Sequence, residues 1–286
     1  MHTLPFLALL IAALLLSLVA VVLGGRRRFR ALVNRGMAEL RADPGPAIGA
    51  EQLAARIDSL PEPVRRHLRF ALPPGAQVPR IVRLKHAGHF RVGRRWLPIR
   101  GEELFTLLKA GFVWNARVQA APLVWIEARD ALLGGKGSML VKLLSTWTIV
   151  GASGPEIDQS AAGRWLVEMT WCPWALGGDA IRWEPIDSHS ARAVLAGDGP
   201  AVAAVMEIDG QGRIIRWTTD RYREVAGGRT VLTPWIGRCS EYREFRGVLV
   251  PEFVEGSWQL SDGEFSYVRF RVTAMEFDPA PPGSPP

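Results

Sequence analysis

The chain has only two cysteines, and it contains none of the short motifs that mark common zinc or hydrolase sites. Cys172 and Cys239 lie far apart in the sequence, so a disulfide between them has no support and we expect two buried free thiols. His-Glu-x-x-His and Cys-x-x-Cys are absent, which argues against a zinc site. Gly-x-Ser-x-Gly is absent as well, so a hydrolase nucleophile turn is not expected. We therefore expect no metal, no cofactor and no catalytic residue of a known motif.

Acidic residues are scarce in the first third of the chain. Residues 26–100 hold 17 Lys and Arg against 5 Asp and Glu, whereas residues 101–286 hold 18 against 23. The net charge of +7 is thus concentrated beside the apolar segment described next. Membrane lipids with anionic headgroups are the expected partner of such a segment. Nucleic acid is not expected, because no recognition motif and no alternation of Arg with stacking aromatics accompanies the charge.

An apolar run of 20 residues, 4–23, is interrupted only by Pro5 and Ser17. A helix of that length spans a bilayer core of about 30 Å. A cleaved signal peptide is the alternative, but no Lys or Arg precedes the run and no clear small-x-small site precedes Arg26. We therefore favour an uncleaved single-pass anchor in the cell membrane. The arginines that follow place the bulk of the chain in the cytoplasm by the positive-inside rule.

The rest of the chain divides by its pattern. We expect an anchor over residues 1–25, a basic helical stalk or linker over 26–58, one domain over 59–278 and a disordered Pro-rich tail over 279–286. From Pro79 onward apolar residues alternate with polar ones, and tight Gly and Asp turns separate about eleven strands. A sheet of that size should curl and leave a concave face for helices to cover. The predicted fold class is α+β, with a large, half-barrel-like antiparallel sheet and an N-terminal transmembrane helix.

One stretch within the strand region, residues 153–174, has a helical pattern instead. Ser153 and Glu156 predict a capping box at its start, and Pro173 is expected to end it. An apolar stripe follows the cap at helical spacing. Its members are Ile157, Ala161, Trp165, Met169 and Cys172. We expect this helix to lie in the concave face of the sheet as a lid or plug.

Polar residues of the same helix form the first candidate binding group. They are Asp158, Gln159, Arg164 and Glu168. Asp158 and Glu168 are ten positions apart, about 15 Å along a helix axis, so they cannot share a proton as a catalytic pair. One interpretation is a polar site at the mouth of a hollow. The other is a helix-dipole partner, Asp158, and a surface pair of Arg164 with Glu168.

Tryptophan is unusually frequent, and all 11 tryptophans lie between Trp96 and Trp258. One interpretation is a Trp-rich core. The other is that five of them line a cavity for an apolar small molecule, as the walls of such pockets are commonly aromatic. The five candidates are Trp114, Trp125, Trp165, Trp171 and Trp183.

Several segments, taken as a set, carry a family resemblance. They are LPEPVRRHL at 60–68, GPEIDQ at 154–159 with WCPWAL at 171–176, RWEPID at 182–187, TPWIG at 233–237 and SEYRE at 240–244. The set resembles an uncharacterised bacterial family of membrane-anchored proteins, a domain of unknown function, over about residues 58–278. The strand–helix–strand order also resembles the LolA-type lipoprotein carriers. That second resemblance implies a curved sheet whose hollow holds acyl chains, and a location outside the cytoplasm.

The sequence therefore predicts a membrane-anchored protein that binds a lipid or other apolar ligand in the hollow of a curved sheet. An enzyme acting on a membrane-soluble substrate through Asp158, Glu168 and Glu184 is one alternative, although we favour a protein that is not an enzyme. A structural envelope protein with a filled core and no ligand is another. An apolar void beneath the central helix would favour the first hypothesis over the last.

Overall fold

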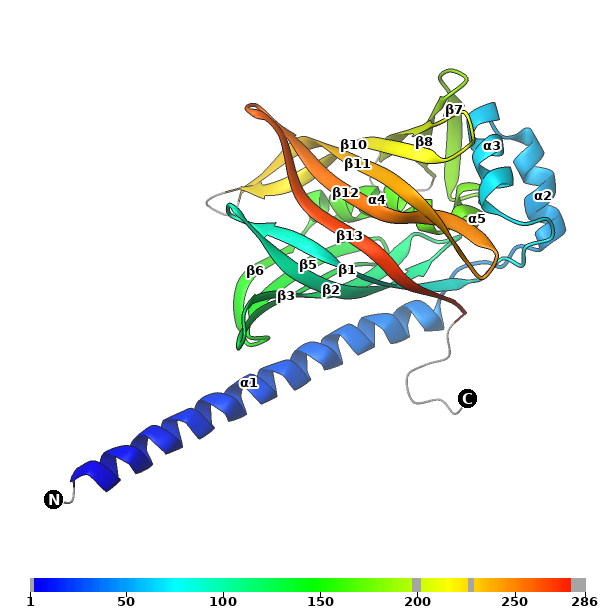
Figure 1. The fold of residues 1–286 in the computed structure, drawn as a ribbon. Helices are drawn as coiled ribbons and strands as arrows, with labels where there is room; N and C mark the ends of the chain where they lie inside the picture. Colours follow the sequence, from blue (N-terminus) through cyan, green and yellow to red (C-terminus); the bar gives the residue numbers. More distant parts are fainter. Residues whose placement is uncertain (1–2, 197–201, 226–228, 279–286) are drawn as a thin grey trace.

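The computed structural model describes residues 3–196, 202–225 and 229–278 (Figure 1). Helix α1 (Thr3–Ala42) is followed by two short helices, α2 (Ala50–Ser59) and α3 (Glu62–Ala71). The Pro-rich tail 279–286, which the sequence predicts to be disordered, lies outside the described residues.

Within the described residues, thirteen strands form a single curved sheet in which every pairing is antiparallel. The strands are β1 (Ile81–Val92), β2 (Arg95–Thr106), β3 (Gly111–Ala121), β4 (Val124–Leu133), β5 (Lys136–Leu143), β6 (Trp147–Ser153), β7 (Ile181–Pro185), β8 (Ser190–Leu195), β9 (Ala203–Ile208), β10 (Ile214–Val225), β11 (Arg229–Phe245), β12 (Val248–Leu260) and β13 (Gly263–Phe277). Their spatial order, β6-β5-β4-β3-β2-β1-β13-β12-β11-β10-β9-β8-β7, consists of two meanders joined where β1 pairs with β13. The half-barrel class predicted from the sequence is confirmed.

The strand count corrects the expected number of about eleven, and two local features explain the difference. The sequence pattern does not predict strand β2, because Pro98 and several charged residues interrupt its alternation. It predicts strands β5 and β6 as a single strand, because the turn between them has no Gly, Pro or Asn to mark it. Leu144 and Ser145 make that turn with φ angles of 49° and 62°, a conformation that residues with side chains rarely adopt.

Helix α4 (Pro155–Glu168) lies in the concave side of the sheet between the two meanders (Figure 1). Trp165 is fully buried, and its Nε1 donates a hydrogen bond of 2.9 Å to the carbonyl oxygen of Thr106. Burying this side chain contributes about 2–3 kcal/mol. Trp171 follows the helix, is 1% exposed, and donates from Nε1 to the carbonyl of Pro251 at 3.1 Å. The helix is therefore a packed plug.

The ends of α4 differ from the predicted ones. Ser153 belongs to β6, and Gly154 at φ 111° precedes the helix with no side chain capping it, so the predicted capping box is wrong. The helix ends at Glu168 and a short 3₁₀ turn, η1 (Met169–Trp171), continues the chain. Pro173 begins helix α5 (Pro173–Leu176), because a proline in a first turn lacks only an N–H that has no helical acceptor.

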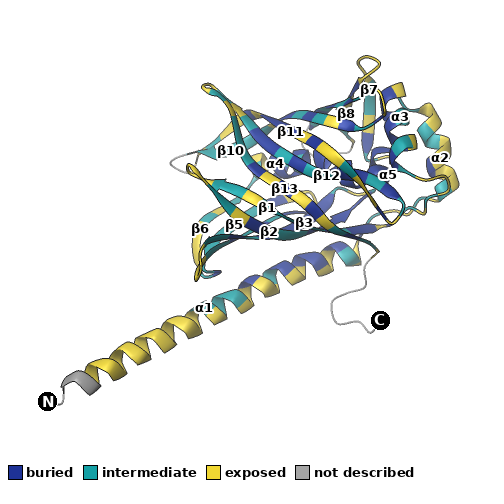
Figure 2. Ribbon diagram, viewed as in Figure 1, coloured by how far each residue is buried: buried dark blue, intermediate teal, exposed yellow. Residues whose placement is uncertain are grey.

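The two halves of α1 have different surroundings (Figure 2). Its most apolar stretch has no buried residue, and this helix is long and apolar enough to cross a membrane. Further along, Phe29, Val33, Met37 and Leu40 recur at helical spacing and are buried against the convex face of the sheet. Gly36 permits the close approach, since a Cβ there would lie 3.0 Å from Val113 Cγ2. The apolar run is thus joined to the sheet by one continuous helix.

Cys172 and Cys239 are both free and buried, as predicted. Burial raises the pKa of the Cys239 thiol to about 12, although a weak contact with the Thr170 hydroxyl opposes the shift. Burial raises the pKa of the Cys172 thiol as well. Thiols held in this state are poor nucleophiles, so neither one is suited to covalent chemistry.

Candidate functional site

Arg164 is the centre of a buried charged cluster on the concave side. Its guanidinium donates hydrogen bonds to Glu168 and Asp130, each at 2.8 Å, and to both oxygens of Glu103 at 3.1 and 3.2 Å. The ring of Trp114 lies 4.7 Å from the guanidinium carbon, a cation–π distance. The pairing of Arg164 with Glu168 was expected at the surface. It exists, but it is buried and ties α4 to strands β2 and β4.

Three carboxylates surround this single guanidinium, and burial shifts the pKa of two of them, Glu103 and Glu168. Desolvation raises the pKa of Glu103 well above its ordinary value; Arg164 opposes the shift and Glu168 adds to it. Burial likewise raises the pKa of Glu168, against the effect of Arg164. Desolvation disfavours the charge of Arg164, but the carboxylates outweigh it and raise its pKa. Burial thus favours the neutral forms of Glu103 and Glu168, while the carboxylates favour the charged form of Arg164, as expected for closely spaced buried groups.

Asp158 holds the start of α4 to the β4–β5 hairpin. Its carboxylate accepts hydrogen bonds from the backbone N–H of Gly137 at 2.7 Å and from Lys136 Nζ at 3.0 Å. A Cβ at Gly137 would lie 2.4 Å from the carbonyl oxygen of Ile157, so the hairpin touches the helix backbone. Gln159, the next candidate, is half-buried on the same turn. These two residues are therefore far along the helix from the Arg164 cluster.

The five candidate tryptophans do not form one wall. Trp114, Trp165 and Trp171 are buried in the core of the concave side, and Trp183 is half-buried on β7, where its Nε1 donates to the carbonyl of Leu176 at 2.8 Å. Trp125 lies on the opposite, convex face. It shares that face with Arg117, whose guanidinium carbon is 4.9 Å from its ring. The sequence interpretation that fits this placement is the Trp-rich core.

The three carboxylates considered for catalysis have separate partners. Asp158 binds Lys136, and Glu168 binds Arg164. Glu184 is half-exposed on β7 and pairs with Arg182 at 2.6 Å. They do not assemble one acid–base group. Among the residues that the structure describes, no three His, Cys, Asp or Glu side chains are placed to hold a metal ion.

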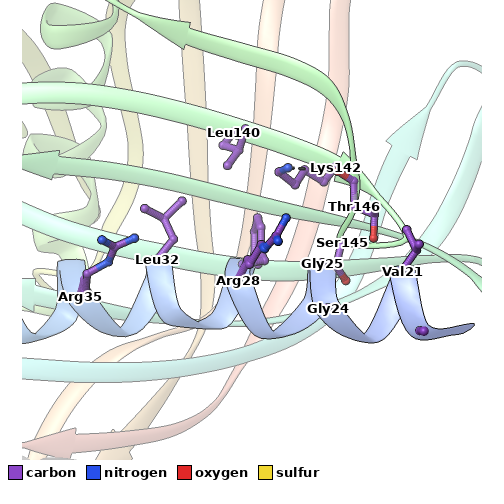
Figure 3. Close-up of a pocket in the computed structure, with 12 residues that line it drawn as sticks. Val21, Gly24, Gly25, Arg28, Leu32, Arg35, Leu140, Lys142, Ser145 and Thr146 are labelled. Carbon is purple, nitrogen blue, oxygen red and sulfur yellow. Dashed lines mark hydrogen bonds between the residues drawn. The ribbon is translucent and has the colours of Figure 1, made fainter.

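Open volume lies instead on the convex face, on either side of α1. The first space, here called the apolar cleft, has a volume of about 630 Å³ and separates α1 from β5 and the β5–β6 turn (Figure 3). Its lining comprises Ala20, Val21, Gly24, Gly25, Arg28, Phe29, Leu32 and Arg35 from α1, and Leu140, Lys142, Ser145 and Thr146 from the sheet. Figure 3 shows Leu32 and Leu140 on opposite walls, with Arg28 and Lys142 nearby. The cleft thus combines an apolar interior with three basic side chains.

Gly25 sets the distance between α1 and the β5–β6 turn. A Cβ at this position would lie 2.1 Å from Thr146 Oγ1, whereas a Cβ at Gly24 would have no atom within 4 Å. The turn is braced by Lys142, whose Nζ donates to the carbonyl of Thr146 at 3.1 Å. None of these cleft residues was predicted as a site residue. The pair of glycines at the end of the apolar run was the one signal in the sequence, because small helical residues permit close packing.

The second space, here called the polar cavity, has a volume of about 840 Å³ and lies across α1 from the apolar cleft. Phe29 lines both spaces and separates them. The polar cavity is bounded by α1, by strands β1 to β4 and by β13, which contributes Thr273. Its charged and amide-bearing walls are formed by Arg26, Arg30, Asn34, Lys85, Arg100, Glu102, Asn115, Arg117 and Glu127.

These features define a class: a helix-plugged, curved antiparallel sheet joined to a helix that could cross a membrane. Residues 51–270 match a family of unknown function, DUF6544, and the chain belongs to that family. No curated protein matches it. The match bears out the first resemblance seen in the sequence, and it brings no activity with it.

Two of the solved structures that match the chain are similar to it in fold. A LolA superfamily protein from Nitrosomonas europaea is 13% identical with a TM-score of 0.41, covering 82% of this chain and 96% of that one. A DUF1329 family protein from Desulfovibrio piger is 10% identical with a TM-score of 0.40, covering 80% and 92%. The first of these belongs to the LolA superfamily, which the strand–helix–strand order of the sequence resembles. Likeness at this level carries no argument about what this chain does.

Proposed function

We propose that this protein is anchored in a membrane by residues 4–23 and binds the acyl part of a lipid in the apolar cleft. The observation that carries the proposal is the shared wall: Ala20 and Val21 belong both to the apolar run and to the lining of the cleft. A chain from the surrounding bilayer would therefore enter the cleft without crossing water.

The exposed apolar half of α1 supports the anchor. Large side chains along it are exposed, among them Phe6 at 72% and Leu16 at 70%. Such a surface is stable in hydrocarbon and unfavourable in water. Cleavage before Arg26 would also remove Ala20, Val21, Gly24 and Gly25 from the cleft, which favours an uncleaved helix.

The chemistry of the cleft supports the ligand class. Its volume falls within the range of about 300–1,000 Å³ that small-molecule sites occupy. Each methylene buried against Leu32 and Leu140 would contribute about 0.8 kcal/mol. Arg28, Arg35 and Lys142 would lie beside an anionic headgroup. The sequence placed the ligand in the hollow of the sheet, but α4 occupies that space, so we assign the ligand to the convex side.

We place the domain on the cytoplasmic side, because four arginines follow the apolar run within residues 26–30. A reporter active only in the cytoplasm, fused after residue 278, tests this orientation. Activity only from a periplasmic reporter would reverse it and agree with the LolA-type location instead.

Filling the cleft tests the binding function. Leu140→Trp should occupy the space between α1 and β5, while Ile215→Trp, at an exposed site on β10, is the matched control. Each protein is purified from membranes in mild detergent, and bound lipid is measured by extraction and mass spectrometry. We expect Leu140→Trp to lower retained lipid at least tenfold, about 1.4 kcal/mol, with an unchanged melting temperature. Lipid-free wild-type protein, or equal retention in Leu140→Trp, would contradict the proposal and favour a structural protein.

A further inference from the structure

The polar cavity has more basic than acidic side chains on its walls. Five are basic: Arg26, Arg30, Lys85, Arg100 and Arg117. Two are acidic, and both already have basic partners. Glu127 pairs with Arg117, and Glu102 pairs with Arg83, which lies outside the cavity. The acids therefore do not neutralise the remaining arginines.

Three guanidiniums at the cavity lack a counter-ion. No carboxylate in the part of the chain that the structure describes forms an ion pair with Arg26, Arg30 or Arg100. Partial burial, followed by the positive charges of Arg117 and Arg30, lowers the pKa of Arg26. Positive charges held this close together without a partner favour the binding of an anion.

Buried polar atoms at the same walls have no hydrogen-bond partner. They are Arg26 Nε, His86 Nδ1, Asn115 Oδ1 and Glu127 Oε2. Glu127 is only 5% exposed, so water does not replace the missing bond freely. Arg26 Nε is a donor, and so is His86 Nδ1, because His86 Nε2 accepts a hydrogen bond from Trp114. A simple anion would satisfy such donors and leave the two acceptors, Asn115 Oδ1 and Glu127 Oε2, unpaired.

We propose that the polar cavity binds a phosphate ester whose neighbouring substituent donates hydrogen bonds, a hydroxyl or an ammonium group. The phosphate lies among Arg26, Arg30 and Arg100, because guanidinium groups bind phosphate oxygens through paired N–H donors. The substituent donates to Asn115 Oδ1 and Glu127 Oε2. The volume of about 840 Å³ accommodates a group of that size.

This chemistry is common to lipid headgroups and to soluble phosphate esters. A headgroup is within reach, since Arg26 follows the apolar run by three residues, about 4.5 Å of helix, and Arg30 lies about one turn further. The inference does not depend on the apolar cleft, which lies on the other side of Phe29. Leu140→Trp should leave phosphate binding unchanged, so the two proposals can fail separately.

Charge removal on the full-length protein tests the site. The variant Arg30→Gln/Arg100→Gln removes two cavity arginines, both exposed and outside the core. Its matched control is Arg94→Gln/Arg95→Gln, which removes two exposed arginines at the β1–β2 turn. Calorimetry with glycerol 3-phosphate measures the soluble arm in detergent. Native mass spectrometry of protein from nanodiscs containing phosphatidylethanolamine and phosphatidylglycerol measures the lipid arm.

We expect the cavity variant to bind about a hundredfold more weakly, a factor of ten for each arginine, in whichever arm binds. If the wild-type protein retains phospholipid and the cavity variant does not, the cavity is a site for a lipid headgroup. Glycerol 3-phosphate binding with the same dependence and no retained lipid identifies a soluble ester. Binding in neither arm, or an equal loss in the Arg94→Gln/Arg95→Gln control, overturns the proposal.

Asn115→Ala tests the predicted hydrogen-bond donor on the ligand. It removes one acceptor and leaves the arginines in place. We expect the preference for glycerol 3-phosphate over inorganic phosphate to fall about fivefold to tenfold. The affinity for inorganic phosphate should stay the same. An unchanged preference would show that the cavity binds phosphate without contacting its substituent, and would refute that part of the assignment.

Discussion

The concave and convex faces of the sheet are covered in different ways. On the concave face, α4 brings its own aromatic side chains and its charges find partners inside the fold, as Arg164 does with Glu103 and Glu168. On the convex face a single straight helix, α1, crosses a wide sheet, and space remains on both sides of Phe29. Abundant tryptophan therefore marks the filled face, and the open volume lies under the helix that the sequence suggested was a stalk.

The largest expected contrast comes from truncating one tryptophan on each face. Trp165→Ala removes a fully buried side chain and should lower the free energy of unfolding by about 3–5 kcal/mol. Trp125→Ala, on the convex face and half-buried, should cost about 1 kcal/mol, mainly through its bond to Ser145. Denaturant unfolding in detergent measures both. Equal losses would mean that α4 is not a packed plug.

Two neighbouring glycines sharpen the comparison at the convex face. Gly25→Ala would place Cβ against Thr146 and push the β5–β6 turn away, while Gly24→Ala meets nothing. Because both changes favour helix equally, their difference isolates the contact. We expect Gly25→Ala to be about 1–3 kcal/mol less stable than Gly24→Ala, measured by thermal unfolding. It should also retain less lipid. Identical behaviour would indicate that the turn does not rest on α1.

A smaller effect on stability should depend on pH. It concerns the buried charged cluster around Arg164. Since burial raises the pKa of Glu103, the folded state keeps its proton while the unfolded state loses it above about pH 4.5. Wild-type stability should therefore fall as the pH rises through the folded pKa, and Glu103→Gln should lack that fall. From about pH 4.5 upward, the stability of Glu103→Gln should rise relative to that of the wild type. Unfolding measured at several pH values tests this.

The half-exposed Glu184 provides the opposite sign. Its hydrogen bond from Arg182 lowers the pKa of the carboxyl, so its contribution to stability is present above about pH 4.5 and disappears as the pH falls through the folded pKa. Glu184→Gln should therefore be slightly less stable than the wild type at neutral pH and equally stable in acid. If the stability of both variants relative to the wild type changed with pH in the same direction, the raised pKa of Glu103 would be refuted.

The sequence predicts much of the fold where one face of a strand is buried and the other is exposed to solvent. The sequence predicts tight Gly turns between strands, and Gly134 and Gly135, between β4 and β5, indeed have φ of 54° and 76°. The sequence pattern does not predict β2, because Pro98 and several charged residues interrupt its alternation. It also failed at Leu144 and Ser145, where side-chain-bearing residues adopt the turn conformation that glycine usually signals.

The candidate site was less predictable for a different reason. Asn115 and Glu127 are polar residues at alternate positions of their strands, and in the sequence they look like ordinary solvent-facing residues. Whether they face water or a cavity depends on where α1 lies against the sheet. The stripe of Phe29, Val33 and Met37 shows that α1 has an apolar face, but the stripe does not predict which surface of the sheet that face packs against.

The last prediction concerns how the convex side meets the bilayer. The β5–β6 turn touches α1 at Gly25, just after the apolar run ends, so Trp147 and its 45% exposed ring should lie at the lipid headgroups, where tryptophan is enriched. Trp147→Cys can be labelled selectively with a fluorescent dye because both native thiols are buried. In nanodiscs the label should shift to the blue and be quenched by spin-labelled lipid, whereas a label at Ile186→Cys, just after β7, should not. Equal quenching at both sites, or none at Trp147→Cys, would show that this edge of the sheet stands away from the membrane.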